Sequence, residues 1–466
     1  MSRAALPEPA HCGAETAPPA ARTAGPVVRR VPYGPVLPVV AVLAALAVPM
    51  APGGAGGAGP ADVVSGLLVL CCALRLLRAR RRPLTPVAAV VLGLPVAGFA
   101  LAALTALTAL AVSPAPAVCA GLARYLQVFV LVPAAVLLLI RDRADFRAAA
   151  WAFVGLALWQ GGVGTHQYLT GTGASYQGAP VRAVGTFGAG DVMGMATAVA
   201  LGLVCATGLA LGRDTRARER AVAAGCAAML LVPLALSFSR GAWIATAVTC
   251  AAQLLLAGAR RALRAGAVLA AAAVVLVGGP DVGTALLAER FDSITRVADA
   301  PDQSVRDRYA LWSAAVGSWR EHPVTGVGLK NFPQVRDGHA PLSLSAASDT
   351  GGAGAAFRRQ PLLSPHNMYL LVLSEQGLAG LTAVAGSWLA LLVCALRGLR
   401  RARRERPARA GGPACGLIAC GLLLWQLVDF AYGDIGGPST VLTALSFGLV
   451  AWWATAAEPG PGGGAR

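Results

Sequence analysis

The feature that most constrains this chain is a succession of long apolar runs. Hydrophobic residues make up 56% of the 466 residues and charged residues only 13%, which is too apolar for an ordinary soluble domain. Apolar runs of roughly 17 to 25 residues predict helices that cross a lipid bilayer. Such runs lie near 35–52, 61–77, 84–112, 117–140, 145–165, 189–212, 219–238, 241–258, 262–282, 367–396, 414–432 and 437–457. The sequence therefore predicts an all-α polytopic membrane protein with about twelve transmembrane helices.

The positive charge of the chain follows the same alternation. A formal net charge of +17 from 39 Lys and Arg residues can indicate nucleic-acid binding, so its location has to be examined first. Most of these residues fall on one side of the predicted helices, in the N-terminal tail and in 75–82, 141–147, 212–220, 259–264 and 397–409. Positive residues collect in cytoplasmic loops. The basicity therefore reflects topology, and it predicts a multi-pass inner or plasma membrane protein with both termini in the cytoplasm.

These patterns divide the chain into five parts. Residues 1–32, rich in Pro and Ala, are expected to form a disordered cytoplasmic tail. The first nine helices occupy 33–282, and a large extracytoplasmic loop follows over 283–365. The last three helices occupy 366–457, and 458–466 is a short cytoplasmic tail.

Neither a metal site nor a cofactor site is indicated. Of the ten cysteines, Cys12 lies in the tail and the others fall within predicted helices, so the sequence suggests neither a disulfide framework nor a thiolate site. The chain has no phosphate-binding loop, dinucleotide-binding fingerprint, zinc motif or nucleophile elbow. No metal and no cofactor are expected.

Three extracytoplasmic segments stand out between the predicted helices. The segment from His166 to Asp191 is rich in Gly, Ser and Thr, which predicts an irregular loop. The turn SFSRG, Ser237–Gly241, is a short hinge between two spans. The third segment, about 282–365, is far longer than a simple connector.

The third segment is expected to contain an amphipathic helix. Within 302–320, apolar residues recur at spacings of three or four, at Val305, Tyr309, Trp312 and Val316. This pattern predicts a helix that lies on the bilayer surface or caps the bundle. The stretch 342–357 has no such period and is expected to be mobile.

Three arginines on the extracytoplasmic side are candidates for anion binding. Arg240 sits at a membrane boundary between two apolar runs, where an arginine is costly unless it is paired or reaches the interface. A guanidinium matches phosphate oxygens with bidentate geometry. Arg182 and Arg308 lie in the first and third segments. Each arginine by itself can equally be a solvated or snorkelling side chain, but three on one side suggest a site for a diphosphate.

His366 is the histidine best placed for chemistry, because it precedes the helix at 367–396 in the sequence SPHN. Its imidazole can take a proton from a hydroxyl group near neutral pH; a structural histidine at the interface is the competing interpretation. Asn367 can satisfy free backbone donors at the helix start. Glu375 lies about 13 Å deeper along the helix, too far to orient His366, and a carboxylate within a span usually has a role.

Around these residues the chain resembles the O-antigen ligase and polymerase family of bacterial membrane proteins. The resemblance rests on RAVGTFG, SFSRGAW, RDRYALWSAAVGSWREHPVTGVGLKNF and HNMYLLVLSEQGLAGL, at 182–188, 237–243, 306–332 and 366–381. It covers about the last two-thirds of the chain, and its most specific part combines HP-x-x-G-x-G with HN-x-Y-L-x-x-x-x-E-x-G. The family often has Pro-Asn after GTFG, where this chain has Gly190-Asp191.

The resemblance implies a metal-independent glycosyltransferase. Its donor would be a glycan on undecaprenyl diphosphate, and its acceptor a hydroxyl group of a glycolipid, a growing polysaccharide, the cell wall or a protein. By position, Arg182, Arg240 and Arg308 would bind the diphosphate and stabilise it as leaving group, and His366 would help to activate the acceptor hydroxyl. Arg240, Arg308 and His366 would be catalytic, and Asn367 and Glu375 would support them.

Two other classes of function stay open on the sequence. A lipid-linked glycan transporter or flippase would use the same arginines without breaking a bond, although the predicted spans carry few charges besides Arg124, Glu375 and Asp429. A non-catalytic partner in polysaccharide assembly is the third class.

Overall fold

The computed structural model describes residues 34–49, 59–78, 85–110, 114–176, 182–261, 263, 303–340, 347–352, 358–361, 363–404 and 412–455. Both expected tails, 1–32 and 458–466, lie outside the described residues. The expected span at 262–282 also lies outside them, apart from residue 263.

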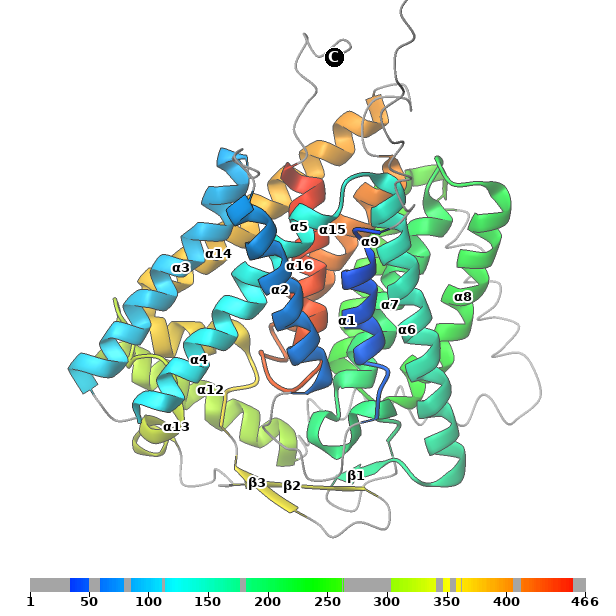
Figure 1. The fold of residues 1–466 in the computed structure, drawn as a ribbon. Coiled ribbons are helices and arrows are strands. Elements are labelled where there is room, and N and C mark those ends of the chain that lie inside the picture. The colour runs from blue at the N-terminus through cyan, green and yellow to red at the C-terminus, as the bar shows by residue number, and fades with distance from the viewer. Residues whose placement is uncertain are drawn as a thin grey trace, which may run out of the picture.

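The described chain is mainly a bundle of helices (Figure 1). Its first half contains α1 (Leu37–Ala45), α2 (Pro60–Arg78), α3 (Pro86–Thr105), α4 (Ala115–Leu126), α5 (Val132–Leu139), α6 (Arg143–Thr170), α7 (Gly194–Leu211), α8 (Ala217–Leu236) and α9 (Arg240–Ala257). The second half contains α12 (Gln303–Glu321), α13 (Phe332–Val335), α14 (Met368–Arg404), α15 (Pro413–Asp429) and α16 (Thr440–Thr455). π-Helical turns follow α3 at Ala106–Leu110 and α4 at Gln127–Leu131.

Within the described residues, seven helices are long and apolar enough to cross a membrane. They coincide with the expected spans at 61–77, 84–112, 117–140, 189–212, 219–238, 241–258 and 367–396. The helices α15 and α16 are apolar but shorter, and α1 has only 9 residues where a span is expected at 35–52. A polytopic, mainly α-helical membrane protein is confirmed, and the total of twelve spans stays a prediction.

Arginine-rich segments that are far apart in the sequence meet at one end of the bundle. Arg261, after α9, is in electrostatic range of Arg213, Arg220 and Arg403. These residues come from three of the segments that are predicted to share the cytoplasmic side. The helix α12 lies at the opposite end, away from the last turns of α14 (Figure 1). The arrangement is the one that alternation of the helices across a membrane requires.

A cluster of buried aromatic rings joins the two halves of the chain. Phe129 contacts Trp388 of α14 and Phe447 of α16, with ring centroids 5.7 Å apart in each pair. Trp388 also lies 4.9 Å from Phe430, the residue that follows α15. Such pairs contribute about 0.5–1.5 kcal/mol each beyond their buried area. The cluster therefore packs Phe430, where the chain leaves α15, against α14.

The structure adds a small sheet that the sequence did not predict. The strands β1 (Ala174–Tyr176), β2 (Ala347–Gly352) and β3 (Arg358–Pro361) pair antiparallel in the order β1-β2-β3. The expectation of an irregular loop at 166–191 is wrong at β1, because this loop pairs with β2, which lies in the stretch 342–357 that is expected to be mobile. Each strand is short and rich in small or polar residues, so no apolar alternation marked it in the sequence.

The long helix α14 is broken near its N-terminal end. Gly377 has φ 64° and ψ −164°, a conformation that belongs almost entirely to glycine. The backbone of the loop that follows α12, 322–332, enters this break. Four hydrogen bonds hold it there: Leu378 N to Pro323 O (2.9 Å), Ala379 N to Val324 O (3.1 Å), Val327 N to Ser374 O (2.8 Å) and Gly328 N to Glu375 O (2.9 Å). Backbone groups that the break frees are thereby satisfied by the loop.

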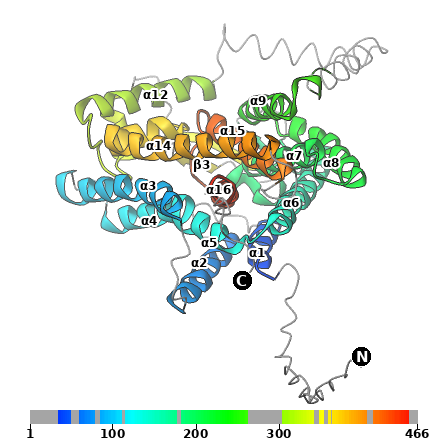
Figure 2. The same ribbon diagram turned by 90° about the horizontal axis from the view of Figure 1, so that it is seen from above.

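The glycines of the HP-x-x-G-x-G pattern are explained by this close approach. A Cβ atom at Gly326 would lie 2.4 Å from the carbonyl carbon of Glu375, and one at Gly328 would lie 2.7 Å from Cα of Ala106. Both glycines also have positive φ, 70° and 93°. Only glycine lets the loop pass between α14 and the end of α3. Figure 2 shows α14 between α12 and α3.

Candidate functional site

His366 lies immediately before α14 in a strained backbone conformation. Its φ of 50° places a non-glycine residue in the left-handed region, a conformation that persists only where the surroundings enforce it. The next residue, Asn367, caps the helix, since its Oδ1 accepts from the Leu370 N–H at 3.0 Å. This is the role that the sequence predicted for Asn367.

The segment between α15 and α16 holds this helix start. We call Phe430–Ser439 the α15–α16 connection. Asn367 Nδ2 donates to Ala431 O at 3.1 Å, and the Met368 N–H lies 2.8 Å from Phe430 O and 3.0 Å from Gly433 O. The position of His366 therefore depends on the connection as well as on α14.

The helix α12 brings Arg308 to His366. Trp312 Nε1 donates to Pro365 O at 2.9 Å, which ties α12 to the residue before the histidine. Arg308 lies one turn earlier on α12 and acts electrostatically on His366. The structure thus unites two of the predicted site residues that are 58 positions apart in the sequence.

The helix α12 lies where the sequence predicts an amphipathic helix, but its buried face differs. The predicted apolar stripe includes Tyr309, which is 57% exposed. The most buried side chains of α12 are instead Asp307, Ala310, Leu311, Ala314, Ala315 and Ser318. Apart from Leu311, small residues dominate this buried face because they permit close packing, whereas Val305, Trp312 and Val316 are only half-buried.

Asp434, which no sequence pattern singled out, is a further charged group near His366. It lies in the α15–α16 connection and acts electrostatically on His366, on Asp429 and on Glu375. Burial lowers the pKa of His366 below its usual 6.5; the negative charge of Asp434 raises it, and the positive charge of Arg308 lowers it. An acidic residue after the apolar run at 414–432 was the only signal available in the sequence.

Arg182 and Arg240 lie in two neighbouring segments. Arg240 is the first residue of α9, capped by Ser239, whose Oγ accepts from the Ala242 N–H at 3.3 Å. The Ala183 N–H, next to Arg182, lies 3.4 Å from Leu236 O at the end of α8. The positive end of the α9 dipole is at Arg240 as well, and helix N-termini favour anions.

The α15–α16 connection lies between the two pairs of site residues. On the His366 side it bonds to Asn367. On the Arg240 side, a Cβ atom at Gly241 would lie 3.2 Å from Cβ of Tyr432. The connection therefore contacts the chain next to His366 and the helix that begins at Arg240. Arg308 lies on α12, which bonds to Pro365 beside His366, and Arg182 precedes Ala183, which bonds to the end of α8.

Glu375 does not face His366 but belongs to the break in α14. It is 1% exposed and accepts hydrogen bonds from the backbone of Lys330 and of Phe332, with the Lys330 charge nearby. Its carboxylate therefore helps to hold the loop 322–332. The supporting role predicted for Glu375 stays a prediction, and the contacts of its carboxylate are with this loop.

Asp191, at the position where the chain departs from the usual Pro-Asn, is turned toward the α15–α16 connection. Its Oδ2 accepts from the Ser439 N–H at 2.9 Å. In the described part of the chain, no three His, Cys, Asp or Glu side chains gather as a metal site would require.

One comparison with known proteins finds a family match, mostly in the second half of the chain. Residues 224–385 match the family model described as O-Antigen ligase. This segment includes Arg240, Arg308 and His366, whereas Arg182 and Asp434 lie outside it. No curated protein matches the chain.

Proposed function

The chain belongs to the O-antigen ligase family, and on this premise we propose that it transfers a glycan from undecaprenyl diphosphate to a hydroxyl acceptor at the extracytoplasmic face of the membrane. Membership supports a membrane glycosyltransferase in general. The observation that carries the finer proposal is the meeting of Arg308 and His366 at the start of α14, through the bond from Trp312 to Pro365.

In the proposed reaction the acceptor oxygen attacks the anomeric carbon of the glycan. His366 accepts the hydroxyl proton as the new glycosidic bond forms. The bond between the anomeric carbon and the phosphate oxygen breaks, and its electron pair leaves with the diphosphate. Arg240 and Arg308, with Arg182, neutralise the charge that develops on this leaving group. A guanidinium remains charged throughout, so this stabilisation does not depend on pH.

The topology supports placing this chemistry outside the cytoplasm. The arginine-rich segments meet at the end of the bundle opposite α12, and positive segments favour the cytoplasmic side. We therefore assign α12 and the His366 end to the extracytoplasmic face, with both termini in the cytoplasm and the protein in the inner or plasma membrane. The acceptor is a glycolipid, a polysaccharide, a cell-wall component or a protein.

Reconstitution tests the proposal directly. We expect the purified protein in liposomes to convert a synthetic undecaprenyl-diphosphate glycan and a hydroxyl acceptor into a glycosylated acceptor and free undecaprenyl diphosphate. Panels of glycolipid, polysaccharide, peptidoglycan and protein acceptors identify the acceptor class. Movement of the carrier lipid across the bilayer, without product in any panel, would instead identify a flippase.

The pH dependence of transfer is expected to report on His366. Since the base must be neutral, the rate falls as pH drops through its pKa, and burial and Arg308 place that midpoint below 6.5. Asp434→Asn removes the charge that raises this pKa, so the acid limb should move to still lower pH. The measurement is kcat against pH for both proteins. A limb that stays in place, or moves upward, contradicts the assignment of His366 and Asp434.

A further inference from the structure

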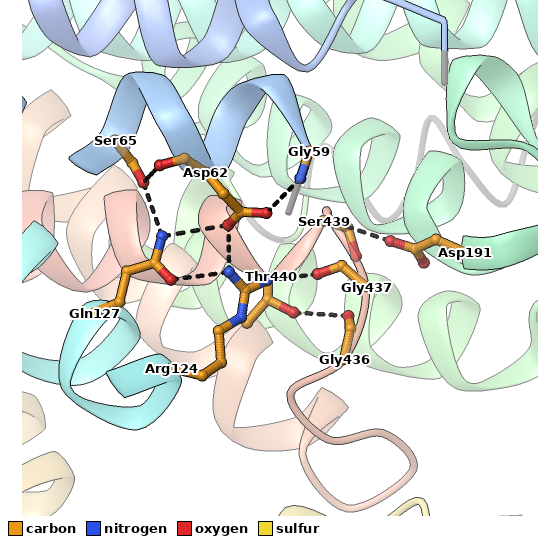
Figure 3. A network of polar contacts seen from close by, with 10 residues as sticks. All are labelled: Gly59, Asp62, Ser65, Arg124, Gln127, Asp191, Gly436, Gly437, Ser439 and Thr440. Carbon is orange, nitrogen blue, oxygen red and sulfur yellow. Dashed lines mark hydrogen bonds and ion pairs between the residues drawn. The ribbon is translucent and has the colours of Figure 1, made fainter. Parts of the chain in front are cut away.

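A polar network joins α2 and α4 (Figure 3). Asp62 of α2 forms an ion pair with Arg124 of α4. Gln127 begins the π-helical turn, and its Oε1 accepts from Arg124 Nη1 at 3.0 Å. Its Nε2 donates to Asp62 Oδ1 at 3.2 Å and to Ser65 Oγ at 2.8 Å. Both charges lie in helices apolar enough to span a membrane. Ionisable residues in such positions usually serve a function.

The network extends from Arg124 to the α15–α16 connection. Arg124 Nη2 donates to Gly437 O at 2.7 Å. Two residues later, the Ser439 N–H donates to Asp191 Oδ2 at 2.9 Å. A Cβ atom at Gly437, whose φ is 67°, would lie 2.7 Å from that same Oδ2. The connection is therefore held from two sides: the Arg124 guanidinium donates to its Gly437 carbonyl, and the Asp191 carboxylate accepts from its Ser439 N–H. Hydrogen bonds to charged groups are stronger than those between neutral groups.

The other half of the connection holds the catalytic end of α14. Its residues Phe430, Ala431 and Gly433 accept hydrogen bonds from Asn367 and Met368. Asp434 lies between these residues and the held turn, and it acts on His366. A shift of the turn at Gly437 would therefore change the position of Asp434 relative to His366.

Arg124 is poorly suited to bind the diphosphate itself. Its charge is balanced by Asp62, and its two terminal nitrogens donate to Gln127 and to Gly437. Its contacts are those of a residue that fixes backbone.

We propose that Arg124 and Asp191 are positioning residues for glycan transfer, which hold the α15–α16 connection from its two sides so that Asp434 stays beside His366. Asp62 and Gln127 orient the guanidinium of Arg124. The inference rests on the proposed function, and it adds to the site a network that begins in the first membrane-spanning helices.

The test compares Arg124→Met and Asp191→Ala with the wild-type protein in liposomes. Both variants should lower kcat by about 10²-fold, because misplacement of a catalytic group by about 1 Å costs that much, while KM for the lipid-linked glycan stays unchanged. The acid limb of kcat should move to lower pH, as expected for Asp434→Asn. Combined with Asp434→Asn, either variant should cause no further shift, since both act through the same group.

Two control variants separate positioning from general damage. Arg147→Met breaks another interhelical ion pair, Arg147–Glu219 at 3.2 Å, whose arginine is 25% exposed against 24% for Arg124. This ion pair joins α6 to the first turn of α8 and includes none of the proposed site residues, so the variant should leave kcat and the pH profile unchanged. Asp191→Asn keeps an oxygen that can accept from Ser439, so it should retain most of the activity that Asp191→Ala loses.

Each outcome decides the inference. Wild-type kcat and an unmoved acid limb in both variants overturn it. A lower kcat with an unmoved limb, or a full additional shift in the double variants, also overturns it, since the damage is then only structural. If Arg124→Met does not accumulate in the membrane, Asp191→Ala decides alone. An inactive wild-type protein counts against the proposed function, whereas active wild type with silent variants counts against the positioning role.

Discussion

Substitution of His366 or Arg240 by alanine is expected to abolish glycan transfer while the protein stays folded in the membrane. Loss of a general base costs about 10²–10⁴-fold in rate, and loss of a group that stabilises the departing charge costs about 10²–10³-fold. For His366→Ala the loss should fall on kcat. Product formation in liposomes measures both effects, and detergent size-exclusion profiles verify folding.

The chain provides matched controls for these two variants. His166 is exposed on α6, and Arg320 is exposed at the end of α12. His166→Ala and Arg320→Ala should retain near wild-type activity, because neither side chain has a role in the proposed reaction. Full transfer by His366→Ala or by Arg240→Ala would remove that residue from the mechanism.

The second large effect is expected at the break in α14. Gly377→Ala would place a Cβ atom 2.3 Å from Val324 O, at a backbone conformation that alanine avoids. Strain of this kind costs about 1–3 kcal/mol for the backbone alone, and the clash also displaces the loop 322–332. We expect a large loss of folded protein and a lower thermal unfolding midpoint in detergent.

Gly386, in the same helix, provides a control for the effect of a glycine-to-alanine change without backbone strain. At Gly386 a Cβ atom would meet only a side-chain carbon of Leu94, at 3.9 Å. Gly386→Ala should therefore leave stability unchanged or raise it by up to about 1 kcal/mol, since alanine favours helices. An unchanged unfolding midpoint in Gly377→Ala would show that the loop does not depend on the break.

The site residues with the clearest local patterns could be predicted from the sequence. Arg240 and His366 stand at the ends of apolar runs, where polar groups are costly and therefore informative. Asp434 follows an apolar run as well, but in a loop that contains Gly433, Gly436 and Gly437 it resembles any solvated turn residue. The polar residues that surround Arg124 gave no joint signal, because Asp62, Gln127 and Asp191 are ordinary polar residues until the fold brings them together.

Apolar run lengths and charge alternation were sufficient, by themselves, to determine a polytopic helical membrane protein, because a bilayer admits few other ways to satisfy backbone hydrogen bonds. Resemblance added the family and the roles expected for four residues that already stood out in the sequence. Only the tertiary structure decided that the loop 322–332 enters a break in α14, that Glu375 supports this loop, and that the α15–α16 connection lies between Arg240 and His366. These features depend on contacts between segments up to about three hundred residues apart, such as Arg124 with Gly437, and no local hydrophobic period encodes them.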